Sequence, residues 1–131
     1  MKKIFIVLIL FIGLINNVSA EIKRILSGNE NAKITIIVYE SLTCSHCASF
    51  HKDVYPQLKK NYIDTGIVKI EFRHFPLDVA AFNASKIAQC KQDQSLEILE
   101  SLYSNQQAWV KGNTAEEIDK NLKKFLDKEG F

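Results

Sequence analysis

The chain has 131 residues, which is enough for one small domain. Residues 1–20 hold two of the seventeen basic residues and none of the acidic ones, so the remainder carries fifteen of each and no formal net charge. No basic stripe is left there to bind nucleic acid, and no block of like charge indicates an interaction tail.

Residues 1–20 are predicted to be a signal peptide. Lys2 and Lys3 give a positive start, residues 4–15 form an apolar run, and small side chains surround a cleavage position after Ala20. A membrane anchor is the alternative, but the run is shorter than the roughly 20 apolar residues that span a bilayer. We therefore expect cleavage and no stable membrane insertion afterwards, with an uncleaved or lipid-associated form as the remaining possibility.

The next segments predict a strand, a helix and a second strand. Residues 21–33 are polar with a turn at 27–29, and residues 34–39 form a nearly continuous β-branched run, typical of a strand buried on both faces. Residues 43–61 predict a helix with Phe50, Val54 and Leu58 on its apolar face and a kink at Pro56. Residues 67–72 alternate apolar and charged, which predicts a strand with one more exposed face, in a right-handed βαβ unit.

Helical patterns follow the second strand. Residues 79–91 are alanine-rich, and residues 95–110 carry an apolar stripe. Thr114 and Glu117 form a capping box that opens a last helix, which Gly130 could cap at its end. Two strands cannot make a well-covered sheet, so we expect the chain to be an incomplete fold, aggregated or molten on its own. The expected stripes are Leu96, Leu99, Leu102 and Tyr103 in one helix and Ile118, Leu122, Phe125 and Leu126 in the other.

Cys44 and Cys47 are the predicted reactive pair. Disulfides persist outside the cytosol, and three cysteines with two of them only three positions apart indicate a redox pair plus one extra thiol rather than a disulfide framework. At a helix start, Cys44 lies among unpaired backbone N–H groups that stabilise its thiolate. Cysteines in such motifs have a pKa of roughly 3.5 to 7.5, against about 8.5 for a free thiol. Ser45 and His46 separate the two, and His46 can stabilise the thiolate by charge or by a hydrogen bond.

Two other readings of the pair stay open. The first is half of a zinc site, although a second paired motif, which zinc commonly needs, is missing from the sequence. The second is a structural disulfide, which would close a loop too small to stabilise much. The further ligands of a zinc site would come from His46, His51, His74 or Cys90.

Three residues outside the motif have both a structural and a functional interpretation, and a fourth, Trp109, has a structural one only. Cys90 is expected to be a small buried hydrophobe, with a third redox thiol or a dimer disulfide as alternatives. His51 is expected to be an ordinary polar helix residue, and a role in tuning the site is the alternative. Glu40 is expected to end its strand, or else to act as an acid in proton transfer. Trp109 is expected in the core or on the surface of the helical region.

Three separated segments resemble the DsbA family of periplasmic disulfide oxidoreductases, from about Leu26 to the end of the chain. They are GNENAKITIIVYESLTCSHCASFH, RHFPLD and AFNASKIAQC. The resemblance implies an α/β, thioredoxin-like fold with a helical domain inserted after the second strand, periplasmic localisation, Cys44 as the exposed attacking thiol and Cys47 as the buried resolving thiol. On this basis we divide the chain into a signal peptide (1–20) and an incomplete thioredoxin-like domain (21–131), made of a βαβ unit with the redox motif (26–78) and an inserted helical region (79–131).

The chain departs from the family pattern at two places. Between the two cysteines, Ser45 precedes the histidine where the family more commonly has proline. The family also continues into a cis-proline loop, two further strands and a last helix, and these have no match in this chain. Neither Pro56 nor Pro76 fits that loop. We therefore interpret the chain as truncated at its C-terminus.

The resemblance implies the function as well. We expect a thiol–disulfide oxidoreductase that introduces disulfide bonds into reduced exported proteins, without a cofactor or metal, and that a membrane quinone-linked protein reoxidises. A reductase or isomerase of the same fold, and a nonfunctional gene fragment, remain as alternatives.

Overall fold

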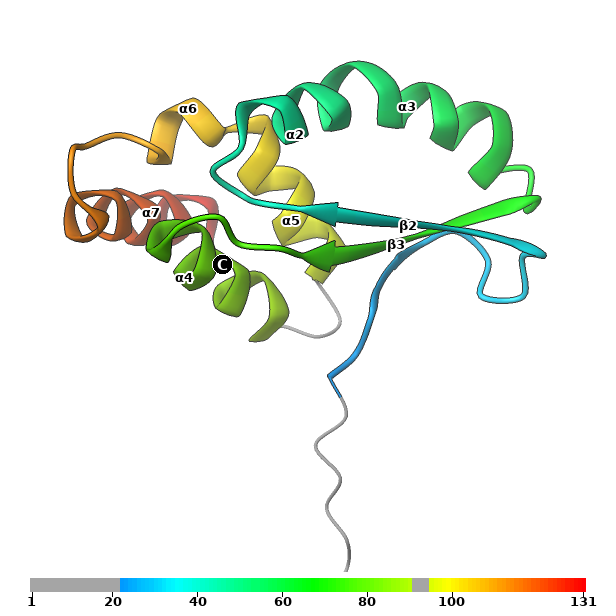
Figure 1. The fold of residues 1–131 in the computed structure, drawn as a ribbon, viewed down its shortest axis with the longest axis horizontal. Coiled ribbons are helices and arrows are strands. Elements are labelled where there is room, and N and C mark those ends of the chain that lie inside the picture. Colours follow the sequence, from blue (N-terminus) through cyan, green and yellow to red (C-terminus); the bar gives the residue numbers. More distant parts are fainter. Residues whose placement is uncertain (1–21, 91–94) are drawn as a thin grey trace, which may run out of the picture.

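The computed structural model describes residues 22–90 and 95–131, so the predicted signal peptide at 1–20 lies outside the described residues. A three-stranded sheet organises the fold (Figure 1). Its strands are β1 (Ile25–Ser27), β2 (Ile34–Glu40) and β3 (Val68–His74), in the order β1-β3-β2. β2 runs parallel to β3, as the predicted βαβ unit requires, and β1 runs antiparallel to it.

Strand β1 lies in a segment that the sequence predicted to be a polar turn region, so the prediction of only two strands is wrong. Three residues are too few to show an alternating pattern, although Ile25 and Ser27 are both buried. The predicted turn follows at Gly28, whose φ is +105°, and a Cβ there would lie 2.7 Å from Cγ2 of Ile63. Glycine is therefore required both by the backbone conformation and by the close helix.

The predicted burial of the two longer strands is reversed. β2 was expected to be buried on both faces, but it is an edge strand, with Ile37 44% and Tyr39 61% exposed. β3 lies between the other two strands, and four of its seven residues are buried: Val68, Ile70, Glu71 and Phe72. β2 is the more apolar of the two strands and yet the more exposed, so position in the sheet, which the sequence does not state, decides which strand is covered.

The predicted helix at 43–61 is present as one long helical segment along one side of the sheet (Figure 1). Two π-helical stretches interrupt it, and Pro56, which cannot donate a backbone hydrogen bond, lies just after the first. The predicted apolar face is confirmed at Phe50 and Leu58, which pack against the core, and wrong at Val54, which is exposed. His51 and Tyr55 are buried in addition. Hydrogen bonds satisfy these buried polar groups: Ser27 Oγ and Tyr55 Oη, for example, are hydrogen-bonded at 2.7 Å. The parts are α2 (Ser45–Ser49), η1 (Phe50–Val54), α3 (Tyr55–Leu58) and η2 (Lys59–Ile63).

The remaining helices gather beyond the carboxyl ends of β2 and β3 (Figure 1). They are α4 (Val79–Cys90), α5 (Ser95–Ser104), α6 (Gln106–Trp109) and α7 (Ala115–Glu129). The helix predicted at 95–110 is therefore two helices, which separate at Asn105. Trp109 is fully buried, and its indole N–H donates to the Leu102 carbonyl at 2.9 Å, so α6 is fixed onto α5.

The predicted capping box at the start of α7 is confirmed with one change. Thr114 Oγ1 accepts from the Glu117 amide at 3.3 Å, as expected, but the Glu117 carboxylate accepts from the Asn113 amide at 2.8 Å instead of from the cap residue itself. Gly130 ends the helix at φ +82°. Leu122, Phe125 and Leu126 are buried, so the predicted apolar stripe faces the core.

Two leucines allow a matched test of this core. Leu99 is fully buried in α5, whereas Leu77 is 67% exposed. Leu99→Ala should lower the free energy of unfolding by about 2–5 kcal/mol, because it leaves a cavity in the core. Leu77→Ala should change it by less than about 0.5 kcal/mol. Urea unfolding of the full chain measures both, and equal effects would contradict the position of α5.

Candidate active site

Cys44 lies at the start of α2, directly after the loop that leaves the carboxyl end of β2. It is the N-cap residue, with extended backbone angles (φ −77°, ψ 119°), and its carbonyl accepts from the Ala48 amide at 3.2 Å. The expected placement of the first cysteine at a helix N-terminus, with Cys47 inside the first turn, is therefore what the structure shows. Unpaired amides at this position favour a negative sulfur.

The surroundings of Cys44 stabilise its thiolate. The Cys47 thiol donates to the Cys44 sulfur, and this hydrogen bond is the largest of the effects that lower the pKa of Cys44 below its ordinary value of 9.0. Backbone hydrogen bonds from Cys47 and His46 lower the pKa further, while partial burial opposes them. A chain of donors that favours the charged form is one of the three general causes of a lowered pKa.

Cys47 is shifted in the opposite direction. Burial raises the pKa of Cys47, and the negative charges of Cys44 and Glu40 raise it further, while a backbone hydrogen bond from Ser41 lowers it. The two sulfurs share one hydrogen bond, so a proton held by Cys47 and a charge held by Cys44 stabilise each other. In the reduced pair, these shifts favour a thiolate on Cys44 and a thiol on Cys47.

Ser45 and His46, the two predicted supporting residues, have exposed side chains. The contribution of His46 to the Cys44 sulfur comes from its backbone amide. The imidazole therefore lies at the surface beside the motif, where a second polypeptide can reach it.

Side chains far away in the sequence hold the loop before α2, and sequence reasoning missed them. The Gln106 amide, buried at the start of α6, donates to the carbonyls of Leu42 at 2.9 Å and Cys44 at 3.0 Å. Thr43 Oγ1 donates to Asp78 Oδ2 at 2.6 Å, and the other oxygen of Asp78 accepts from the Ala81 amide at the start of α4. The helical region therefore fixes the geometry of the motif, and a single glutamine or aspartate in the sequence gives no signal of this.

A buried, hydrogen-bonded pair of side chains lies behind the motif. His51 Nε2 and Glu40 Oε2 are 2.8 Å apart, and both residues are buried. The His51 ring stacks on Tyr103 with 4.1 Å between centroids, and lies 5.1 Å from the ring of Phe72. We expected His51 to be an ordinary polar helix residue and Glu40 to end its strand, and neither interpretation accounts for this buried contact. The contact supports the alternative, in which His51 tunes the site.

Cys90 is exposed, so the expectation of a small buried hydrophobe is wrong. Helix α4 buries Ala84 and Ala88, and two residues of helical rotation carry Cys90 away from that face. Within the ranges described, no three histidine, cysteine or acidic side chains converge as a metal site would need. None of the helices in those ranges is long and apolar enough to cross a bilayer.

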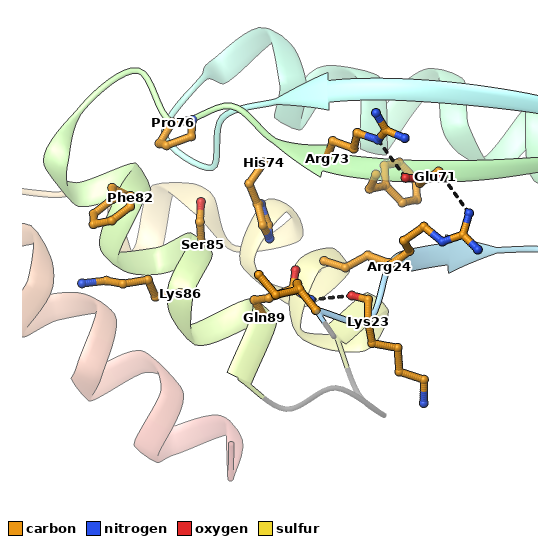
Figure 2. A pocket seen from close by; sticks show the side chains of 13 residues that line it. Lys23, Arg24, Glu71, Arg73, His74, Pro76, Phe82, Ser85, Lys86 and Gln89 are labelled. Atoms are coloured by element: carbon orange, nitrogen blue, oxygen red, sulfur yellow. Dashed lines mark hydrogen bonds and ion pairs between the residues drawn. The ribbon is translucent and has the colours of Figure 1, made fainter. Parts of the chain in front are cut away.

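Two cavities lie in different parts of the described chain. One of about 680 Å³ opens beside the motif and is lined by Ser45, His51 and Tyr103, among others. The second, of about 400 Å³, lies between the β1–β3 edge and α4 (Figure 2). His74 points into it, and burial lowers the pKa of that imidazole. Arg24 and Arg73 pair with Glu71 on its wall, where they hold the pKa of that carboxyl below its ordinary value.

Comparisons with known proteins agree on the fold and the family. A sequence profile described as Thioredoxin matches residues 20–131. A variant of alpha-DsbA1 from Wolbachia pipientis superposes with a TM-score of 0.69 at 34% identity, over 82% of this chain and 54% of that one. The chain belongs to the DsbA-like group of the thioredoxin family. The predicted α/β, thioredoxin-like fold with a helical insertion is thereby confirmed.

Two curated members of this group are also similar in sequence. A Rickettsia bellii protein, provisionally named a protein-disulfide oxidoreductase, is 34% identical over 93 residues, which cover 70% of this chain and 36% of that protein. Disulfide bond formation protein D of Bacillus subtilis is 28% identical over 121 residues, which cover 79% of this chain and 54% of that protein. The chain thus spans between about a third and a half of the length of these relatives.

The hydrogen bond between the two sulfurs can be tested by substitution of its donor. Because the pKa of Cys44 is lowered, its thiolate should persist below pH 9.0 and disappear only as the pH falls through the lowered value. Serine in Cys47→Ser still donates to the Cys44 sulfur, whereas alanine in Cys47→Ala does not. The midpoint of Cys44 labelling by iodoacetamide, followed by mass spectrometry across pH, should therefore be higher in Cys47→Ala than in Cys47→Ser.

In the unsubstituted reduced chain at about pH 6, Cys44 should be alkylated before Cys47 and Cys90. Cys90 is the internal comparison, because it is the most exposed of the three. Earlier labelling of Cys47 or Cys90, or identical midpoints in the two variants, would contradict this assignment.

Proposed function

We propose that the chain is a thiol–disulfide oxidoreductase that introduces disulfide bonds into reduced exported proteins through Cys44 and Cys47. The observation that carries the proposal is the opposite shift of the two thiols, with the pKa of Cys44 lowered and that of Cys47 raised across one shared hydrogen bond. Membership of the DsbA-like group supports the same chemistry.

The reaction follows from this asymmetry. A substrate thiolate attacks the sulfur of Cys44 in the disulfide form, the bond to Cys47 breaks, and its electron pair leaves on Cys47, which takes up a proton. The second substrate thiolate then attacks the substrate sulfur of the mixed disulfide and expels Cys44 as a thiolate. The substrate loses two electrons, and the Cys44–Cys47 pair gains them.

The stabilised Cys44 thiolate gives this exchange its direction. A thiol of low pKa is a good leaving group, and stabilisation of the reduced form makes the disulfide form a stronger oxidant. The exposed surface of His46 and the cavity beside Ser45 leave room for a second polypeptide at the attacking sulfur. These features favour oxidation of substrates over their reduction or isomerisation.

The proposal includes the cellular compartment of the chain, its substrates and its reoxidising partner. The signal-peptide pattern at residues 1–20 supports export, and the family resemblance supports the periplasm. Its substrates would be reduced exported proteins. A membrane protein linked to quinone would accept the electrons and restore the disulfide.

The resolving step gives a direct test in cells. In Cys47→Ser, Cys44 has no internal partner, so mixed disulfides with exported proteins should accumulate on Cys44 as bands that disappear on reduction. Non-reducing gels followed by mass spectrometry would identify them. Cys44→Ser is the matched control and should form none. If the two variants give the same gel, with no covalent adducts in either, the proposed function is wrong.

A further inference from the structure

The cavity of about 680 Å³ beside the motif lies between the long helical segment and the helical region. Ser45, Ser49 and Lys52 line one wall, from the first two turns of the helical segment. Asn105 and Gln107 line the other wall, where α5 is followed by α6 (Figure 1). None of the strands in the described ranges contributes to its lining. Its volume falls within the range of about 300–1,000 Å³ that is usual for ligand sites.

The cavity begins directly beside the reactive sulfur. Ser45 is the residue after Cys44, and Gln106, which also lines the cavity, donates to the Cys44 carbonyl at 3.0 Å. A polypeptide whose cysteine attacks Cys44 has to continue on both sides of that cysteine. The part of it that runs toward α5 and α6 therefore enters this cavity.

The lining suits a polypeptide better than an apolar ligand. Most of the lining residues are serine, asparagine or glutamine, and Ser45, Ser49 and Gln107 are exposed. Hydroxyl and amide side chains both donate and accept hydrogen bonds, as the backbone N–H and C=O groups of an extended segment require. Pockets for small organic ligands are instead lined mainly by apolar side chains.

Lys52 carries the one fixed charge among the described residues that line the cavity, and no aspartate or glutamate is among them. It follows Cys44 by eight residues. A helix rises about 1.5 Å per residue, so Lys52 lies about 12 Å from Cys44 along the helical segment. An extended polypeptide covers about 3.3–3.6 Å per residue. A carboxylate about three or four positions from the substrate cysteine therefore reaches the ammonium group of Lys52.

We propose that this cavity is a subsite for the substrate polypeptide: it holds the extended segment next to the cysteine that attacks Cys44, and Lys52 favours segments with an acidic residue about three or four positions from that cysteine. The inference rests on the proposed function, because it needs a substrate polypeptide at Cys44. It adds a preference among substrates, determined by the helical region and not by the sheet.

The contribution of Lys52 is small in energy and acts on the choice of substrate. An exposed ion pair contributes little, and salt weakens it further. Hydrogen bonds from the lining side chains to a polypeptide backbone are available to every sequence. The cavity therefore accepts many sequences and favours the acidic ones among them.

The first test compares two peptides with the same pair of cysteines. They differ only in whether aspartate or asparagine occupies the third and fourth positions outside each cysteine. The second-order rate constant for oxidation of each peptide by the disulfide form of the full chain is measured at an ionic strength of about 0.01 M, where charges are weakly screened. The ratio of the two rate constants, aspartate over asparagine, should be about two- to fivefold lower in Lys52→Gln than in the unsubstituted chain.

Lys60→Gln is the matched control, because it removes the same charge from an exposed position of the same helical segment that does not line the cavity. Its ratio should equal that of the unsubstituted chain. The effect of aspartate on the reactivity of the peptide thiols cancels when ratios are compared between variants. Equal ratios in Lys52→Gln and Lys60→Gln would overturn the role of Lys52.

The second test fills the cavity. Ala108 is exposed and lines the cavity from α6, so the indole in Ala108→Trp occupies the space of the substrate segment. The rate of reaction with the asparagine peptide, divided by the rate with a small dithiol, should fall by at least about fivefold. Gln57→Trp, at an exposed position of α3 outside the cavity, should leave this quotient unchanged. The same quotient in both tryptophan variants would overturn the subsite.

Other occupants give other results. If a second copy of the chain covers the cavity, gel filtration should show a dimer that Ala108→Trp dissociates, and the proposal is wrong. If only a reoxidising protein uses the cavity, neither peptide measurement changes, and the proposal is wrong as well. The proposed function fails in a different way, when the disulfide form oxidises neither the peptides nor the small dithiol.

Discussion

The buried hydrogen bond between His51 and Glu40 joins the carboxyl end of β2 to the long helical segment that carries both cysteines. This contact ties the helix to the sheet, and the His51 ring also stacks on Tyr103 of α5. The strand β2, the long helical segment and helix α5 therefore all contact the imidazole of His51. These contacts determine the surroundings of the two cysteines. Cys47 is half-buried on the same face of the helix, and Cys44 lies at the exposed N-terminal end.

Those parts of the site that depend on local sequence were predictable. A C-x-x-C motif after a strand places the first cysteine among free amides wherever a helix begins there, and Cys44 is found at that position. The capping box at Thr114 and the left-handed Gly130 are equally local, since each depends on residues within one turn. Local geometry leaves few alternatives, so the residue types alone indicate the structure.

Properties set by distant contacts were not predictable. β2 is more apolar than β3, yet the pairing of β1 with β3 makes β2 the edge strand and β3 the centre of the sheet. Gln106 holds the carbonyls of Leu42 and Cys44 across more than sixty residues of sequence. His51 is polar, so the sequence predicts an exposed side chain. Only its contact with Glu40 on another element explains why it is buried. In each case a contact between separate elements reverses what hydrophobicity suggests.

The opposite shifts of the two thiols determine how many protons accompany the reaction. Between the lowered pKa of Cys44 and the raised pKa of Cys47, the reduced pair holds one proton, and that proton resides on Cys47. Reduction of the disulfide in this range therefore takes up two electrons and a single proton. In the proposed reaction Cys44 is therefore the sulfur that exchanges covalent bonds with the substrate and keeps its charge. Cys47, whose pKa is raised by burial, is the sulfur that gains and loses the proton.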